Sequence, residues 1–344
     1  MKTVKVCVIG CSGMGQHHMK GVINKDGAEL YGICDIHKEA VDAVMEKLGH
    51  CGIKKAVTDY RELVNDPEVD AAIIVTPDQF HRQITIDFLN AGKAVLCEKP
   101  MALNLAECQE MLDAQKKVGG SLMIGQVCRC TPAFILAKQL VDEGRIGDLF
   151  FVESEYAHNY ESSKGVDNWR MTPERHGFIG GACHAVDLLR WIAGDPTEVF
   201  AYANHKCLTD WPTDDCVIAV YKFPNDVKGK VFTSIGCCRA YTMRTVLYGT
   251  KGTIICDNTT PYIQLFENGD KIAGHRRYSC PTQIPVSLNS HNINAEIDIF
   301  VDAVMKGEPM PISSLEGAST IAVCTATVES TKSGAPVQIK YPTL

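Results

Sequence analysis

The first 125 residues alternate short apolar runs with longer segments of helical periodicity, and this alternation restricts the fold more than any other feature of the sequence. Apolar runs lie at 4–10, 28–35, 69–77, 94–100 and 121–127, and helical patterns are typified by 38–49 and 105–119. Such alternation predicts a parallel β-sheet wrapped by helices. The run AAIIV at 71–75 has no polar face, which is typical of a strand covered on both sides. We therefore expect an α/β domain with a doubly wound parallel sheet over residues 1–125.

Beyond about residue 148 the pattern changes to longer β-rich stretches. Apolar and polar residues alternate at 149–158, 198–205, 215–223, 229–238, 244–257 and 262–268. Alternation with a period of two residues predicts a mostly antiparallel sheet. Helical patterns at 184–194, 291–306 and 314–333 complete this part of the chain. We therefore expect a second domain of the α+β class over residues 126–344.

Composition argues against several functional classes. The chain of 344 residues has a formal net charge of −7 with Lys and Arg spread along it, so we expect no nucleic-acid partner. No window offers the roughly eighteen uncharged apolar residues that a membrane-spanning helix needs. The sixteen cysteines are scattered without a CxxC pair, which favours reduced thiols in a cytoplasmic protein over a disulfide framework or a metal site.

A glycine-rich turn follows the first apolar run and precedes a helical pattern at 14–24. The dinucleotide-binding fingerprint has Gly at its first, third and sixth positions, which here are Gly10, Ser12 and Gly15, with an additional Gly13. Backbone N–H groups at the start of such a helix can hold a pyrophosphate. The candidate cofactor-binding residues of the turn are Gly10, Ser12, Gly13, Met14 and Gly15. The alternative is a tight turn without a ligand.

An acidic residue stands at the distance that the same fingerprint requires. Asp35 lies 20 residues after Gly15, at the end of the second apolar run, where a carboxylate bonds a ribose 2′-hydroxyl. A carboxylate there would repel a 2′-phosphate, and no Arg follows it. We therefore expect NAD as the cofactor, with NADP less favoured.

Two more candidate corners lie at the ends of predicted parallel strands. Thr76 and Pro77 end the third apolar run, and Lys99 precedes Pro100 at the end of the fourth. Open α/β sheets bind their ligands at the carboxyl ends of the strands. These corners are therefore candidates for cofactor and substrate contacts, although a loop lysine is often only a solvated surface charge.

These motifs together resemble the Gfo/Idh/MocA family, named for glucose-fructose oxidoreductase and inositol dehydrogenase. The resemblance rests on the glycine turn with Asp35 and on the segments VTPDQFH, CEKP, GQVCRCTPAFILAKQLVDEGRIGDL and CHAVDLLRWIAG. It implies a Rossmann domain that binds NAD(P) and a second domain whose large open sheet holds the substrate and supports a homodimer or homotetramer. It also implies that Lys99 lies beside the substrate hydroxyl and the nicotinamide, that Glu98 shapes the same corner, and that Thr76, Pro77 and His81 line the cofactor.

The helical pattern at 184–194 supplies a candidate base. His184 begins it, with Asp187 on the same face three residues later. A helix start disfavours imidazolium and so favours a neutral ring that can accept a proton, and the resemblance implies that this histidine is the general base. The family's usual acid four residues earlier is Gly180 here, so we expect Asp187, or Tyr156 and His158, to complete the site. The alternatives are a core histidine, and an ion pair of Asp187 with Arg190.

The same resemblance suggests substrate-facing positions, each of which could instead be structural. They are Arg129, Tyr156, His158, Trp169 and Asp187. The combined prediction is an NAD-dependent oxidoreductase that moves a hydride between nicotinamide and a ring hydroxyl of a sugar, cyclitol or glycoside, with Lys99 and His184 as catalytic residues. Two alternatives remain open. The chain could cleave glycosides with NAD as a recycled internal oxidant, or bind NAD as a sensor without catalysis.

Overall fold

A computed structural model describes residues 3–267, 271–272, 275–276 and 280–344. Its contacts divide the chain into two compact units. The first consists of residues 1–127, 292–321 and 341–344, and the second of residues 128–291 and 322–340. Among the described residues, no helix is both long enough and apolar enough to cross a membrane.

The first unit is built on a six-stranded sheet whose neighbouring strands are all parallel. In chain order its strands are β1 (Val4–Ile9), β2 (Ala28–Cys34), β3 (Lys55–Val57), β4 (Ala71–Ile74), β5 (Ala94–Glu98) and β6 (Leu122–Gly125). Their spatial order is β3-β2-β1-β4-β5-β6, the doubly wound order whose switch point lies between β1 and β4. This confirms the predicted parallel sheet and places the glycine turn at the switch point.

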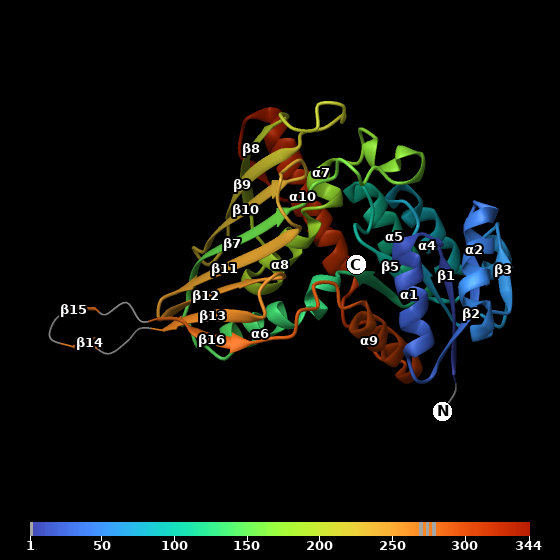
Figure 1. Cartoon of the computed structure of the whole chain (residues 1–344). Coiled ribbons are helices and arrows are strands. Elements are labelled where there is room, and N and C mark those ends of the chain that lie inside the picture. Colours follow the sequence, from blue (N-terminus) through green and yellow to red (C-terminus); the bar gives the residue numbers. More distant parts are fainter. Residues whose placement is uncertain (1–2, 268–270, 273–274, 277–279) are drawn as a thin grey trace. The chain divides into compact units, whose positions relative to one another are not determined.

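Helices cover this sheet (Figure 1). They are α1 (Gly13–Asn24), α2 (Lys38–Leu48), α3 (Arg61–Val64), α4 (His81–Asn90), α5 (Leu105–Val118), α9 (Ile293–Lys306) and the first part of α10 (Ser314–Ser333). Helices α1 and α9 lie side by side although they are far apart in the sequence. A Cβ on Gly21 of α1 would overlap the side chain of Ile297 on α9, so glycine permits this close approach.

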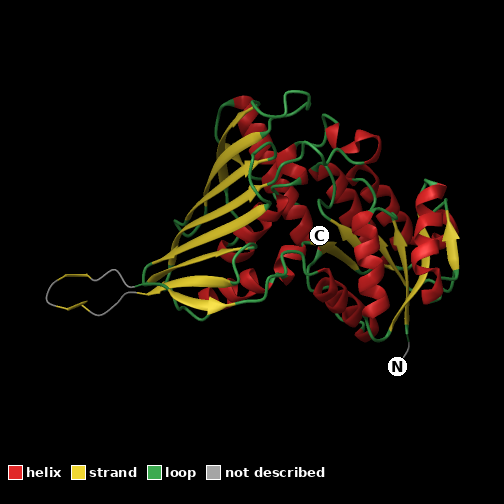
Figure 2. Cartoon of the chain, viewed as in Figure 1, coloured by secondary structure: helices red, strands yellow, loops and turns green. Residues whose placement is uncertain are grey.

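The second unit is built on a nine-stranded sheet (Figure 2). Its strands are β7 (Leu149–Ala157), β8 (Glu198–Asn204), β9 (Cys216–Lys222), β10 (Lys228–Ser234), β11 (Thr242–Gly249), β12 (Gly252–Asp257), β13 (Tyr262–Glu267), β16 (Thr282–Pro285) and β17 (Val337–Gln338). They lie in the order β16-β13-β12-β11-β7-β10-β9-β8-β17, and β7 with β10 is the parallel pair among antiparallel neighbours. The predicted, mostly antiparallel sheet is confirmed. Two short strands, β14 (Lys271–Ile272) and β15 (His275–Arg276), pair with each other.

Helices of the second unit lie against one face of this sheet. They are α6 (Pro132–Asp142), α7 (Gly177–Gly180), α8 (Cys183–Ala193) and the end of α10, and α8 packs on β7, β10 and β11. Residues of β9 alternate between buried and exposed, as expected for a sheet with one solvated face. That face exposes large apolar side chains, including Tyr202, Ile218 and Val220.

The predicted helices agree closely with the observed ones. The predicted domain boundaries, which divide the chain once, differ from the two observed units. Helix α10 has the predicted bounds 314–333, and α2 and α5 end within a residue of theirs. The structure differs from the predicted division 1–125 and 126–344, because residues 292–321 and 341–344 return to the first unit. The predicted strand at 262–268 ends at Glu267, and Asn268 lies outside the described residues.

Candidate active site

The glycine turn joins β1 to α1 and leaves room for a phosphate group. Gly10 has a φ of +112°, and a Cβ there would lie 2.5 Å from the carbonyl oxygen of Val75, so the position requires glycine. A Cβ on Gly15 would overlap the carbonyl of Gly10, whereas one on Gly13 would meet nothing within 4 Å. Ser12 precedes α1 without a side-chain capping bond, and the first turn holds no acidic residue. The helix dipole and N–H groups can therefore act on an anion.

Asp35 lies beside this turn, directly after β2. Its carboxylate accepts hydrogen bonds from the backbone N–H groups of Cys11 (2.8 Å) and His37 (3.0 Å). The acid of the fingerprint is thus hydrogen-bonded to Cys11, the residue that follows Gly10. The side chain of Met14, in the first turn of α1, is half-buried. The structure brings together the predicted cofactor-binding residues of the first and second strand ends.

His81 links the other two predicted corners. One ring nitrogen lies 3.0 Å from the carbonyl oxygen of Thr76, and the other lies 2.9 Å from that of Pro100. Burial lowers the pKa of His81, but Cys97, Asp78 and the Pro100 carbonyl outweigh it and raise the pKa to about 10. A ring protonated on both nitrogens can donate to both carbonyls. His81 therefore holds the Thr76–Pro77 corner against the corner that follows Lys99.

The CEKP corner places a buried carboxylate behind Lys99. Glu98 ends β5 and accepts hydrogen bonds from His18 Nε2 (2.7 Å) and from the backbone N–H of Lys99 (3.1 Å). Burial raises the pKa of Glu98, but the His18 hydrogen bond and the charges of His18 and Lys99 hold it at about 2. The Lys99 side chain is half-buried. A second buried carboxyl group, Glu296 of α9, lies in the same cluster.

His184 lies in the second unit, at the second position of α8, and is 1% exposed. Its Nδ1 lies 3.2 Å from Cys128 Sγ, and the thiol of Cys128 donates in turn to Met243 Sδ at 3.2 Å. A thiol that donates to Met243 leaves its sulfur to accept from Nδ1–H of His184. In that neutral tautomer Nε2 carries a lone pair and can accept a proton.

Aromatic and imidazole groups surround this ring. Tyr156 stacks on His184 with centroids 6.1 Å apart, and the ring of His291 lies 5.4 Å from it. Tyr156 Oη is within hydrogen-bond distance of Tyr160 Oη (2.8 Å) and His158 Nδ1 (3.1 Å). Burial, followed by the neighbouring tyrosines, raises the pKa of Tyr156 well above its ordinary value, so its hydroxyl stays protonated. The structure thus joins three predicted residues, Tyr156, His158 and His184, in one cluster.

Asp187 lies in a buried ion pair, and its role in place of the missing family acid stays a prediction. Its two oxygens accept hydrogen bonds from Nε and Nη2 of Arg129, both at 2.8 Å, and its side chain is fully buried. Arg190, the partner in the alternative interpretation, forms an ion pair with Asp195 at 2.7 Å. Asp187 and Arg129, both predicted to face substrate, hold each other in a bidentate pair.

The position of the family acid is filled by a cation. A Cβ on Gly180 would overlap the guanidinium of Arg175, which is 3% exposed. That guanidinium also lies 4.9 Å from the ring of Trp169, on whose ring Arg170 packs at 4.4 Å. Trp169 therefore lies between two arginines, and its role toward substrate stays a prediction.

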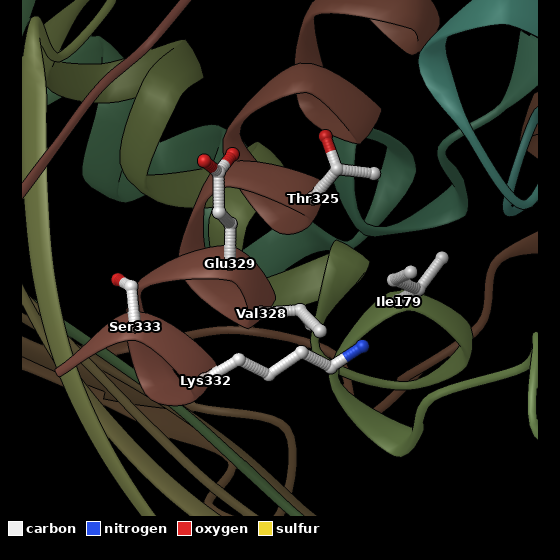
Figure 3. Close-up of a pocket in the computed structure, with 6 residues that line it drawn as sticks. All are labelled: Ile179, Thr325, Val328, Glu329, Lys332 and Ser333. Atoms are coloured by element: carbon white, nitrogen blue, oxygen red, sulfur yellow. The ribbon is translucent and has the colours of Figure 1, made fainter.

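Several residues of the cluster around His184 were not predicted from the sequence. Tyr160, Tyr241 and His291 contact Tyr156, His158 or His184, and Tyr241 Oη lies 3.0 Å from His291 Nε2. Cys128, which lies beside His184, was not predicted either. Lys99 and His184 belong to different units. A hollow in the second unit, lined by Ile179 and by the end of α10 from Thr325 to Ser333, contains none of the predicted residues (Figure 3).

Comparisons with known proteins agree with this architecture. Residues 4–126 match the family model "Oxidoreductase family, NAD-binding Rossmann fold", and residues 134–255 match "GFO/IDH/MocA C-terminal domain". A myo-inositol 2-dehydrogenase of Thermotoga maritima is 27% identical over 91% of this chain and 92% of its own length. A 1,5-anhydro-D-fructose reductase of Ensifer adhaerens is 29% identical over 73% and 75%. A solved levoglucosan dehydrogenase in complex with NADH and L-sorbose has a TM-score of 0.87 at 23% identity, covering 99% of this chain and 100% of that one, which shows the shared fold.

Proposed function

Because the chain belongs to the Gfo/Idh/MocA family of NAD-binding oxidoreductases, we propose that it is an NAD-dependent dehydrogenase for a ring hydroxyl of a sugar, cyclitol or glycoside. The observation that carries the proposal is the buried His184 imidazole, whose Nδ1 lies 3.2 Å from Cys128 Sγ. We infer that its Nε2 is the base. Similarity to inositol 2-dehydrogenase and anhydrofructose reductase supports the polyol class.

Each candidate residue has a chemical task in this proposal. Bound NAD would supply the hydride acceptor at the nicotinamide ring. His184 Nε2 removes the proton of the substrate hydroxyl, and the Lys99 ammonium stabilises the negative charge that develops on that oxygen. The hydroxyl and imidazole groups of Tyr156 and His158 bind neighbouring hydroxyls of the substrate.

The cofactor is held by the first unit in the same proposal. The open space at Gly13 and the acid-free start of α1 take the pyrophosphate, and Asp35 bonds the 2′-hydroxyl of the adenosine ribose. Replacing Asp35 with Ser removes the repulsion toward a 2′-phosphate. We expect the ratio of kcat/KM for NAD to that for NADP to fall at least about tenfold, because a bond to a charged group contributes about 1.5–3 kcal/mol. Glu39→Gln, an exposed acid on α2, is the matched control.

The bare face of the nine-stranded sheet supports a homo-oligomer. Tyr202, Ile218 and Val220 expose 68%, 44% and 50% of their surface there, and exposed apolar patches mark protein interfaces. We expect a dimer or tetramer in light scattering, and Val220→Lys should reduce its mass. Ile36→Lys, at an apolar side chain exposed by 82% in the first unit, should leave the mass unchanged.

The activity itself is tested with a panel of polyols and glycosides, each with NAD and with NADP. Reduced cofactor and released aglycone are followed separately, because aglycone without net reduction would identify glycoside cleavage instead. On the best substrate, Lys99→Ala and His184→Ala should each lower kcat/KM about 10²- to 10⁴-fold. The exposed residues Lys117 and His50, changed to Ala, are matched controls. Unchanged turnover in both catalytic-residue variants would refute the assigned roles.

A further inference from the structure

Three titratable side chains meet inside the first unit, behind Lys99. They are His18 on α1, Glu98 at the end of β5 and Glu296 on α9. One imidazole nitrogen of His18 and one carboxyl oxygen of each glutamate lie within 4.8 Å of one another. His18 and Glu296 are 0% exposed and Glu98 is 7% exposed. We call these three residues the His18–Glu98–Glu296 cluster. Helices α1 and α9 bring it together, and no motif in the sequence marks Glu296.

The two carboxyl groups of this cluster have different hydrogen-bond environments. Glu98 accepts from His18 Nε2 and from the Lys99 backbone N–H. Both side-chain oxygens of Glu296 are buried without a hydrogen-bond partner. A buried ionised carboxylate without partners is far more costly than a neutral carboxyl group in the same place. The geometry therefore favours one ionised carboxylate, at Glu98, and one neutral carboxyl, at Glu296.

The charges that act on Glu296 point the same way. Burial raises the pKa of Glu296 well above its ordinary value, the Glu98 carboxylate raises it further, and the Lys99 ammonium opposes both. The other acids of its helix, Asp298 and Asp302, pair with Lys25 on the exposed side. Two carboxyl groups that share a dry site cannot both ionise at low cost.

We propose that the folded protein carries Glu296 as a neutral carboxylic acid, and that the His18–Glu98–Glu296 cluster thereby presents a single carboxylate charge to Lys99. Glu296 is then a neutral neighbour of Glu98 and not a second charge beside Lys99. The part that concerns Lys99 in catalysis rests on the proposed dehydrogenase function, whereas the protonation of Glu296 does not.

The protonation of Glu296 is tested by stability, without substrate or cofactor. A carboxyl group whose pKa is raised by folding contributes full stability below its unfolded pKa and loses it as pH rises towards the folded pKa. Above the ordinary pKa of a glutamate and below the raised pKa of folded Glu296, the unfolding equilibrium constant of the wild-type protein should therefore rise relative to that of Glu296→Gln by about tenfold per pH unit, or about 1.4 kcal/mol. Urea unfolding, monitored by circular dichroism at each pH, measures the unfolding equilibrium constants of the wild-type protein and of Glu296→Gln.

Controls make this test specific. Glu308→Gln removes an exposed carboxyl just beyond α9, and its difference from wild type should not vary with pH. Glu296→Met is a second neutral replacement and should show the same pH trend relative to wild type. It replaces Glu296→Gln as the reference if the Gln variant folds poorly. A difference between wild type and both variants that is constant with pH would overturn the proposal. So would a stoichiometric divalent metal in the purified protein whose chelation destabilises it, because Glu296 would then be an ionised ligand.

The link to Lys99 is tested by the pH dependence of kcat/KM on the best substrate. Glu98→Gln should lower the limb assigned to Lys99 by about 1 to 3 pH units, because the carboxylate charge beside Lys99 is lost. Glu296→Gln removes no charge and should leave that limb unchanged. A shift in Glu296→Gln as large as that in Glu98→Gln would refute the single carboxylate charge. If the chain has no dehydrogenase activity, this arm gives no signal while the stability arm still decides the protonation of Glu296.

Discussion

The buried pair of Arg129 and Asp187 offers a sharp test of whether these residues serve the fold or the substrate. The Arg129 side chain is 8% exposed, and Asp187 is fully buried. In Asp187→Asn, the amide oxygen can replace one acceptor, but its NH₂ group meets a guanidinium N–H donor. One charge-assisted hydrogen bond is lost, and the buried guanidinium loses its counter-charge. Removing one partner of a buried pair costs about 3–5 kcal/mol, so we expect Asp187→Asn to destabilise the second unit by about 3 kcal/mol or more.

Tryptophan fluorescence during urea unfolding is the appropriate assay. All three tryptophans, at 169, 191 and 211, lie in the second unit, and Trp191 packs under the Arg129 guanidinium at 5.7 Å. Glu267→Gln is the matched control, since Glu267 also pairs with an arginine of the second unit, Arg145, but both side chains are 44% exposed. An exposed pair contributes about 0–1 kcal/mol. A loss below about 1 kcal/mol in Asp187→Asn, together with a tenfold rise in KM, would refute the structural interpretation and identify Asp187 as a substrate ligand.

Three further predictions follow from the site. Cys128→Ala removes the acceptor of His184 Nδ1–H. Because a hydrogen bond contributes about 0.5–1.5 kcal/mol, kcat/KM should fall about 2- to 13-fold and the acid limb of its pH profile should shift. Superimposable pH profiles would show that Cys128 does not support His184. Gly10→Ala should destabilise the first unit by about 1–3 kcal/mol in circular dichroism melts. Gly13→Ala should leave the melt unchanged and weaken NAD binding in calorimetry. Equal effects of the two variants in both assays would contradict the assigned roles. Folding lowers the pKa of Glu98 to about 2, so the stability that its carboxylate contributes is present above pH 4.5 and lost as pH falls towards 2. The free energy of unfolding of Glu98→Gln should lack this pH dependence. An unchanged pH dependence in Glu98→Gln would contradict the prediction.

The sheets were predictable from the sequence because hydrophobic period is a local property. The parallel strands and helix α10 follow directly from runs and repeats that lie within one segment. The glycine turn was predictable for the same reason, since a strand, Gly10 and a helix start are adjacent in the chain. The position of Asp35 beside that turn also followed from spacing.

The partners of the candidate base were not predictable, because they come from distant segments. Cys128 lies 56 residues before His184, and a thiol at this place has no spacing signature. The ion pair of Asp187 with Arg190 was an open alternative, because three-residue spacing on a helix permits such a contact. Tertiary packing instead brings in Arg129, whose planar fork matches a carboxylate with two bonds.

The return of α9 to the first unit has a consequence for how the nascent chain matures. The ribosome releases the six strands and α1 well before it makes Ile293–Lys306, so the surface around Gly21 that contacts Ile297 stays in water until strands β7 to β16 have been synthesised. Domains generally fold as units during synthesis, the N-terminal one first, but here the first unit is completed only by a helix that follows those strands in the chain. An expression fragment cut at residue 127 would therefore emerge with an uncovered apolar surface, and grafting this nucleotide-binding body onto another protein would require both stretches of sequence.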